Sequence, residues 1–158
     1  ETPLMAYQHI EPLLSSIAKA LGKTKENIKV YDPYFCTGAI VRNMNEIGFA
    51  SVYNKCEDFY QAIKAGTVPD HDVVVTNPPY SSDHVSRIIS WCSTNAKPWF
   101  LLVPNYVYMK DYFAACVAKG KASSMLYVCP EGRYVYESPK GMASALGQRR
   151  KSGERKTA

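Results

Sequence analysis

The chain has 158 residues, of which 46% are hydrophobic and 21% are charged, a composition typical of a soluble globular domain with one sizeable core. No apolar run approaches the ~20 residues that cross a bilayer, and the polar start of the sequence does not indicate a signal peptide. The formal net charge is +5, but five of the 19 Lys and Arg residues and one of the 14 acids lie in residues 148–158. We therefore expect a single, nearly neutral domain over 1–141 and a basic, flexible tail over 142–158.

Helical and strand patterns alternate along almost the whole domain. In chain order, the predicted elements are a helix at 4–21, a strand at 28–32, a helix at 39–47, a strand at 49–54, a helix at 58–66, a strand at 72–76, a helix at 82–92, a strand at 98–104, a helix at 109–120 and strands at 123–129 and 133–138. Pro12 is expected to divide the first helix or to begin its second half. This alternation predicts an α/β fold, with a mostly parallel sheet and helices on both of its faces.

The five cysteines form no CxxC pair and no cluster with histidine. We therefore expect reduced thiols, no disulfide and no metal site, in a cytoplasmic or nuclear protein. His9, His71 and His84 are isolated and are expected to be surface or capping groups. Trp91 and Trp99 are expected in the core.

A polar corner with the sequence DPYFCTG follows the first predicted strand and leads straight into a helix. Asp32 ends the strand, and Gly38 permits a tight turn before the helix. Ligands of open α/β sheets bind outside the carboxyl ends of the strands, and a helix N-terminus offers free N–H groups to an anion. A dinucleotide fingerprint needs three glycines, which argues against a nicotinamide-binding enzyme. The alternative is an ordinary connection between a strand and a helix.

A second corner, in the stretch VVVTNPPYS at 73–81, ends the buried strand on Asn77, two prolines and a tyrosine. A simple turn could be made by Asn-Gly or Asp-Gly. The two corners together resemble the class I S-adenosylmethionine-dependent methyltransferases, and more narrowly the amino-methyltransferases of the adenine-N6 type. Those enzymes often carry a DPF-type glycine loop after their first strand and an Asn/Asp-Pro-Pro-Tyr/Phe motif after their fourth. The resemblance covers about residues 28–108 and places Asp32 and Asn77 at neighbouring strand ends.

The resemblance implies a Rossmann-like methyltransferase fold, with helices on both faces of a mostly parallel sheet. Too few residues separate the strand at 49–54 from the sequence EDF for the usual crossover helix. We therefore expect the sheet to be abridged around its second and third strands. Because the C-terminal end is also short, a second expected abridgement is the loss of the last antiparallel strand of a full methyltransferase sheet.

The chemistry of amino-group methylation explains the residue types of the NPPY motif. An aromatic or amide NH₂ is a poor nucleophile because its lone pair is delocalised. The side-chain oxygen of Asn77 and the carbonyl of Pro78 can accept hydrogen bonds from both N–H groups, while Pro78 and Pro79 make the corner rigid. Tyr80 offers a flat face on which a planar substrate stacks, a contact of roughly 1–3 kcal/mol for a base. The alternative is a rigid turn that leaves a buried strand.

The resemblance assigns S-adenosylmethionine to the first corner, where the loop would wrap its methionine portion and sulfonium. The implied contacts in this loop are Asp32, Pro33, Tyr34, Phe35, Cys36 and Gly38. Thr2 belongs to a Thr-Pro pair ahead of the first helix, similar to the element that precedes the glycine loop in some adenine methyltransferases.

Further cofactor contacts are implied around the end of the second strand. Asn54 stands where the family usually has an acid that grips the ribose hydroxyls, and Glu57 is placed to reach the same group. Asp58 and Phe59 resemble the acid–aromatic pair that recognises adenine. For Glu57 and Asp58, capping of the following helix is an equal alternative.

These residues predict an N-methyltransferase that acts on an exocyclic NH₂ of a nucleobase, adenine first, in RNA or DNA. A protein substrate, glutamine or lysine, is the first alternative, because glutamine presents a similar planar NH₂ and the domain has little net charge. A catalytically inactive binding module with a methyltransferase-like fold is the second. Cys36, where the family usually has glycine, Asn54 and the short crossover favour it. A partner subunit is expected to supply target recognition, and no membrane is expected among the partners.

Overall fold

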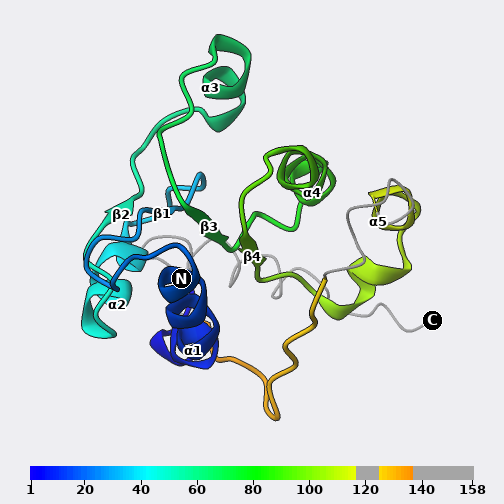
Figure 1. The fold of residues 1–158 in the computed structure, drawn as a ribbon. Helices are drawn as coiled ribbons and strands as arrows, with labels where there is room; N and C mark the ends of the chain where they lie inside the picture. The colour runs from blue at the N-terminus through cyan, green and yellow to red at the C-terminus, as the bar shows by residue number, and fades with distance from the viewer. Residues whose placement is uncertain (117–124, 137–158) are drawn as a thin grey trace, which may run out of the picture.

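Four short parallel strands form one sheet in the order β2-β1-β3-β4, in a computed structural model that describes residues 1–116 and 125–136 (Figure 1). In chain order the elements are α1 (Leu4–Ala20), β1 (Val30–Tyr31), α2 (Ala39–Glu46), β2 (Val52–Tyr53), α3 (Phe59–Ala65), β3 (Val73–Thr76), α4 (His84–Thr94), β4 (Trp99–Leu101), the 3₁₀ helix η1 (Asn105–Met109) and α5 (Asp111–Cys116). The predicted α/β class is therefore confirmed. The chain passes from β2 through α3 directly to β3, so the sheet has no strand between them, as expected for an abridged sheet.

Different helices cover the two faces of the sheet, because side chains alternate between the faces along each strand. Val75 of β3 packs with Leu14 of α1 and Met44 of α2 in one buried cluster. Val74 of the same strand packs with Ile88 of α4 in a second cluster, which also contains the start of α3. Figure 1 shows α1 and α2 on one side of the strands and α3 and α4 on the other. The sheet is thus buried between two helical layers.

Residues 4–20 form one continuous helix, so the prediction that Pro12 divides it is wrong. Pro12 lies inside α1 on its exposed side. A proline in a helix removes one backbone hydrogen bond, and on the solvent side water can satisfy the carbonyl left without a partner. The opposite side of α1 holds the helix against the sheet through its buried residues Ala6, Tyr7, Leu14 and Ala18.

His71 is buried, and the prediction of a surface or capping role is wrong at this position. Its Nε2 lies 2.9 Å from the side-chain amide nitrogen of Asn95, and its Nδ1 lies 2.7 Å from the carbonyl oxygen of Pro69. The amide donates to Nε2, so the ring proton is on Nδ1 and is donated to the carbonyl. Trp91 and Trp99 pack against the core around Val74, as predicted.

The C-terminal part of the described chain contains no strand, although strands were predicted at 123–129 and 133–138. In residues 125–136 this prediction is wrong: Leu126 and Val135 are 81% and 82% exposed, and the sheet ends at β4. The segment instead reaches α1, where the hydroxyl of Tyr134 lies 2.7 Å from Nδ1 of His9. The remainder of the two predicted strands, the end of the helix predicted at 109–120, and the basic tail lie outside the described residues. None of the described helices is both long and apolar enough to cross a membrane.

Candidate functional site at the carboxyl ends of β1 and β3

The two polar corners lie side by side, because β1 and β3 are neighbouring parallel strands. Asp32 directly follows β1, and Asn77 directly follows β3. From β1 the sheet continues to β2 on one side and to β3 on the other, so the strand order reverses between β1 and β3. In open α/β sheets this is the position at which ligands bind. The prediction that Asp32 and Asn77 follow neighbouring strand ends is confirmed.

Asp32 is only 7% exposed, and its carboxyl group is held by two hydrogen bonds to the same oxygen. The hydroxyl of Thr76 donates to Oδ1 at 2.5 Å, and the backbone N–H of Tyr34 donates to Oδ1 at 3.0 Å. Among the described residues, Oδ2 has no hydrogen-bond partner. The site therefore contains a buried carboxyl group with one oxygen left to interact with a ligand.

Burial raises the pKa of Asp32 to about 7, although the hydrogen bonds from Thr76 and Tyr34 favour the ionised form. In the unfolded chain the same group has its ordinary pKa of 3.8. Between these two values the folded protein binds a proton that the unfolded chain has lost. The free energy of unfolding must therefore fall as the pH rises through this range.

We expect Asp32→Asn to remove this pH dependence, because an amide stays neutral while its oxygen still accepts both hydrogen bonds. Urea unfolding at pH 5 and pH 8 measures it. The unaltered protein should lose stability relative to Asp32→Asn between the two pH values. An equal change in both proteins would show that the carboxyl group is ionised throughout.

Both the nitrogen and the oxygen of the Asn77 side-chain amide are hydrogen-bonded. Its Nδ2 donates to the hydroxyl oxygen of Thr2 at 2.9 Å, and its Oδ1 accepts from the hydroxyl of Tyr80 at 2.7 Å. The hydroxyl of Tyr80 also lies 3.2 Å from the carbonyl of Leu102. An amide oxygen accepts two hydrogen bonds, so Tyr80 leaves Oδ1 able to accept one more. Thr2, which the resemblance assigned to the cofactor, is thus in direct contact with Asn77.

The rest of the NPPY motif presents a second acceptor and an aromatic ring. Pro78 is buried, and no donor within the described part of the chain reaches its carbonyl oxygen. Pro79 is exposed, and Tyr80 is 42% exposed. Burial, with Tyr136 and Tyr106 nearby, raises the pKa of Tyr80, so its hydroxyl is uncharged and available as a donor.

The loop after β1 lies against Asn54. Gly38 is the N-terminal cap residue of α2, with φ at +77°, and no side chain caps this helix. A Cβ atom on Gly38 would lie 3.4 Å from the ring of Phe35 and 4.0 Å from Oδ1 of Asn54. Nδ2 of Asn54 donates to the carbonyl of Asp32 at 3.1 Å. Oδ1 of Asn54 is the one buried side-chain acceptor in the described residues that lacks a hydrogen-bond partner. Buried polar groups are nearly always paired, so this oxygen points to a missing donor.

The other residues of this loop divide between the core and the surface. Pro33 is buried, and the ring of Tyr34 meets that of Phe59 with 5.7 Å between centroids. Phe35 and Cys36 are exposed. The hydroxyl of Thr37 donates to the carboxylate of Glu1, which also bonds the side chain of Cys36. The first residues of the chain therefore lie against the loop.

Glu57, Asp58 and Phe59 have protein partners of their own. Asp58 caps α3, because its Oδ1 accepts from the backbone N–H groups of Tyr60 and Gln61 at 2.9 and 3.1 Å. For Asp58, the capping alternative is thus the observed one. Glu57 caps no helix in the described part of the chain and accepts from the hydroxyl of Tyr53 at 2.9 Å. Phe59 is 4% exposed and belongs to the core cluster around Val74.

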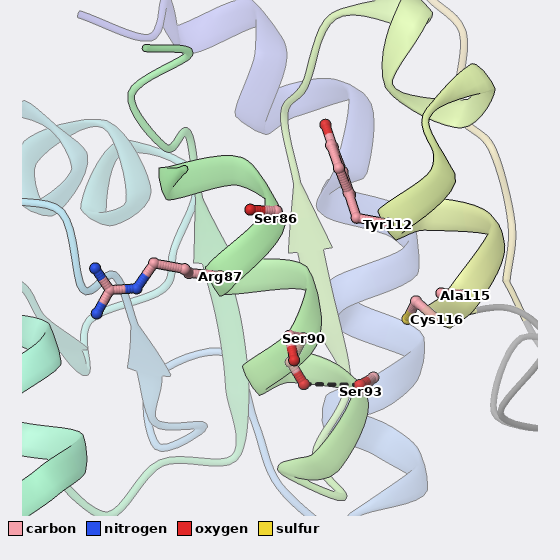
Figure 2. Close-up of a pocket in the computed structure, with 7 residues that line it drawn as sticks. All are labelled: Ser86, Arg87, Ser90, Ser93, Tyr112, Ala115 and Cys116. Atoms are coloured by element: carbon pink, nitrogen blue, oxygen red, sulfur yellow. Dashed lines mark hydrogen bonds between the residues drawn. The ribbon is translucent and has the colours of Figure 1, made fainter. Parts of the chain in front are cut away.

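Two cavities lie away from the strand ends. One, of about 350 Å³, is an open pocket between α4 and α5, and Figure 2 shows the residues that line it: Ser86, Arg87, Ser90, Ser93, Tyr112, Ala115 and Cys116. Arg87 points away from Tyr112 in this view, and its guanidinium lies 3.4 Å from the centre of the Tyr60 ring. The second cavity, of about 280 Å³, lies on that side, between α3 and α4. Neither cavity is lined by Asp32, Asn54 or Asn77.

Sequence reasoning missed Thr76 and Tyr7 as parts of this site. Thr76 follows three valines, and the sequence pattern predicts it only as part of the strand. A hydroxyl at the end of a buried strand is nevertheless a signal in its own right, and in the structure it donates to Asp32. Tyr7 lies in the first helix and contacts Thr2 through a hydrogen bond. No pattern in the sequence brings residues 2 and 7 to the end of β3.

The site does not have the composition of a metal centre. Within the described part of the chain, no three His, Cys, Asp or Glu side chains are grouped to hold a metal ion. The five cysteines are free thiols. Comparison with protein families, curated proteins and solved structures finds no match for this chain.

Proposed function

We propose that this protein is an S-adenosylmethionine-dependent N-methyltransferase that modifies an exocyclic NH₂ group of a nucleobase, with adenine as the first candidate. The observation that carries the proposal is the side-by-side placement of Asp32 and Asn77 where the strand order reverses. One corner carries a buried carboxyl group and the other carries hydrogen-bond acceptors. This pairing suits the transfer of a cationic methyl group to an amine.

The fold supports a Rossmann-like methyltransferase domain that lacks one strand. The sheet order β2-β1-β3-β4 places the DPYFCTG loop and the NPPY motif on adjacent strands. In the proposed fold the glycine loop follows the first strand and the NPPY motif follows the strand next to it in the sheet. The missing strand would have extended the edge beyond β2, which is remote from both corners.

The residues around β1 and β2 fit the cofactor. The orphaned Oδ1 of Asn54 would accept a hydrogen bond from a ribose hydroxyl, and it does not need a charge to do so. The uncapped N-terminus of α2 would hold the carboxylate end, while Asp32 would balance the positive charge. When bound, S-adenosylmethionine supplies a methyl group whose bond to sulfur breaks as a bond to nitrogen forms, leaving a neutral thioether and releasing one proton from nitrogen.

Asn77 and Pro78 would bind the acceptor amine. One lone pair of Asn77 Oδ1 remains available beside the hydroxyl of Tyr80, and the carbonyl of Pro78 is not engaged by the described residues. Two hydrogen bonds accepted from one NH₂ favour a pyramidal nitrogen whose lone pair is available for attack. The rigid prolines hold both acceptors, so catalysis comes mainly from alignment.

The substrate face is aromatic, which favours a planar base. The exposed ring of Tyr80 lies at the site, and Tyr106 and Tyr136 are its neighbours. A base in a duplex would have to flip out of the stack to reach Asn77, whereas a single strand avoids that cost. Outside residues 148–158 the chain is nearly neutral, so a partner subunit would supply most of the affinity for nucleic acid.

Transfer of a labelled methyl group tests this proposal. The purified protein is incubated with S-adenosylmethionine carrying a labelled methyl group and with single-stranded RNA, single-stranded DNA, duplex DNA and a protein extract. We expect label on the adenine amino group of a single strand. Label on protein alone would assign the glutamine or lysine activity instead. Binding of the cofactor without transfer to any acceptor would assign a binding module.

A further inference from the structure

The N-terminal segment reaches the proposed acceptor site through Thr2. The hydroxyl oxygen of Thr2 accepts from Nδ2 of Asn77 at 2.9 Å, and its carbonyl accepts from Nδ2 of Asn43 of α2 at 3.2 Å. The neighbouring Glu1 bonds Thr37 in the loop after β1. Thr2 is therefore tied to helix α2 and is in direct contact with the NPPY motif.

The hydroxyl of Thr2 also contacts Tyr7. Burial and the nearby Asp32 raise the pKa of Tyr7, whereas the hydrogen bond with Thr2 lowers it. Tyr7 is therefore a second hydrogen-bond partner of the Thr2 hydroxyl. Toward Asn77, the oxygen of this hydroxyl is the acceptor, because Nδ2 of Asn77 donates to it at 2.9 Å. An acceptor at this position selects the amide nitrogen of Asn77, not its oxygen.

The orientation of this amide decides whether Asn77 can bind an amine. Rotation of the side chain by half a turn would exchange Oδ1 and Nδ2, and the hydroxyl of Tyr80 would accept as readily as it donates. A rotated Asn77 would present N–H groups to the N–H groups of the substrate. Tyr80 alone therefore does not select the productive orientation.

We propose that Thr2 is a positioning residue that holds Nδ2 of Asn77 toward the N-terminal segment and thereby keeps Oδ1 available for the substrate amine. This inference rests on the proposed function and assigns a different role to Thr2 from the cofactor contact that the sequence resemblance implies. It requires an acceptor at residue 2 and an amide at residue 77, so the two positions must be energetically coupled.

Thr2→Val tests the inference, because valine has nearly the shape of threonine but accepts no hydrogen bond. We expect kcat to fall about tenfold, the size of one lost hydrogen bond at a productive geometry, with unchanged affinity for S-adenosylmethionine. Thr2→Ser should restore kcat. Thr94→Val serves as the matched control, since the hydroxyl of Thr94 donates only to the carbonyl of Trp91 in α4.

The Asn77→Asp background separates positioning from a structural role. A carboxylate has two equivalent oxygens and no wrong orientation, so Thr2→Val should change the residual kcat of Asn77→Asp less than twofold, well below the tenfold expected with asparagine. An equal loss in both backgrounds would overturn the inference and show that Thr2 only supports the fold. Weaker cofactor binding with kcat unchanged would overturn it in favour of a cofactor contact.

A measurement without activity distinguishes failure of this inference from failure of the proposed function. Hydrogen exchange of the Asn77 side-chain NH₂, followed by NMR, should be slowed in the unaltered protein and in Thr2→Ser. It should be faster in Thr2→Val. Exchange that is the same in all three proteins would overturn the inference even if methyl transfer is confirmed, and the expected difference would support it even if no acceptor is methylated.

Discussion

Asn77→Ala is expected to lower kcat for methyl transfer by about 10²–10³, the usual cost of removing one preorganised hydrogen-bonding group at a reacting centre. The change removes the amide oxygen that would accept from the substrate NH₂ and releases Thr2 and Tyr80 from their present partners. Cofactor affinity should change little, because the contacts of Asn77 lie on the NPPY side of the site. Single-turnover transfer of a labelled methyl group measures the chemical step separately from binding.

Two variants make this result specific. Asn45→Ala removes an asparagine whose Nδ2 donates to the carbonyl of Val41 within α2, and it should leave kcat unchanged. Asn77→Asp keeps an acceptor oxygen and should retain far more activity than Asn77→Ala. If Asn77→Ala transfers methyl groups at the rate of the unaltered protein, Asn77 does not bind the amine and the proposed arrangement is wrong.

Gly38→Val is the second change with a large expected effect, this time on cofactor binding. Its side chain would press against the ring of Phe35 and Oδ1 of Asn54, next to the residues proposed to contact the cofactor. Overfilling of a packed site typically costs about 1–3 kcal/mol. We therefore expect the affinity for S-adenosylmethionine to weaken roughly ten- to hundredfold, measured by calorimetric titration.

Gly66→Val is the matched control, because the backbone strain is nearly the same. Gly38 has φ at +77° and Gly66 has φ at +67°, a region that β-branched residues strongly disfavour. A Cβ atom on Gly66 would have no atom within 4 Å, and Gly66 ends α3, outside the site. Both variants should lose similar stability, but only Gly38→Val should lose cofactor affinity. Equal affinities in the two variants would place the cofactor elsewhere.

The order of helices and strands was predictable because each element carries its own local signal. Runs such as VVVT and the glycines after α2 and α3 mark the elements without reference to the rest of the chain. The closeness of Asp32 and Asn77 to each other was predictable from the family resemblance, which places their two strands side by side. The reversal of strand order between β1 and β3 is not encoded locally and is visible only in the structure.

Contacts between distant segments were not predictable from local patterns. Thr2 lies 75 residues before Asn77, and nothing in either segment signals that they meet. The burial of His71 depends on Asn95 in the same way. Pro12 was misjudged because a proline is tolerated on the solvent side of a helix whose other side is well packed. Residues 125–136 have the composition of strands, but strand formation also needs pairing with a sheet edge, and this segment lies against α1 instead of pairing with the edge strands β2 or β4.

Asn54 and Cys36 are the main departures from the methyltransferase pattern, and each has a physical explanation. Asn54 replaces an acid, yet its oxygen is buried and lacks a donor, which is what a ribose-binding acceptor would look like without its ligand. Cys36 replaces a glycine but is exposed, and its side chain is hydrogen-bonded to Glu1.

Calorimetric titration of the unaltered protein with S-adenosylmethionine is the most direct test, since every proposed step depends on the methyl donor binding at the carboxyl end of β1. Saturable binding in the micromolar range, strengthening as the pH rises through about 7 and Asp32 ionises, is the result that we expect. Absence of heat up to millimolar donor, in a protein that unfolds cooperatively, would contradict the account.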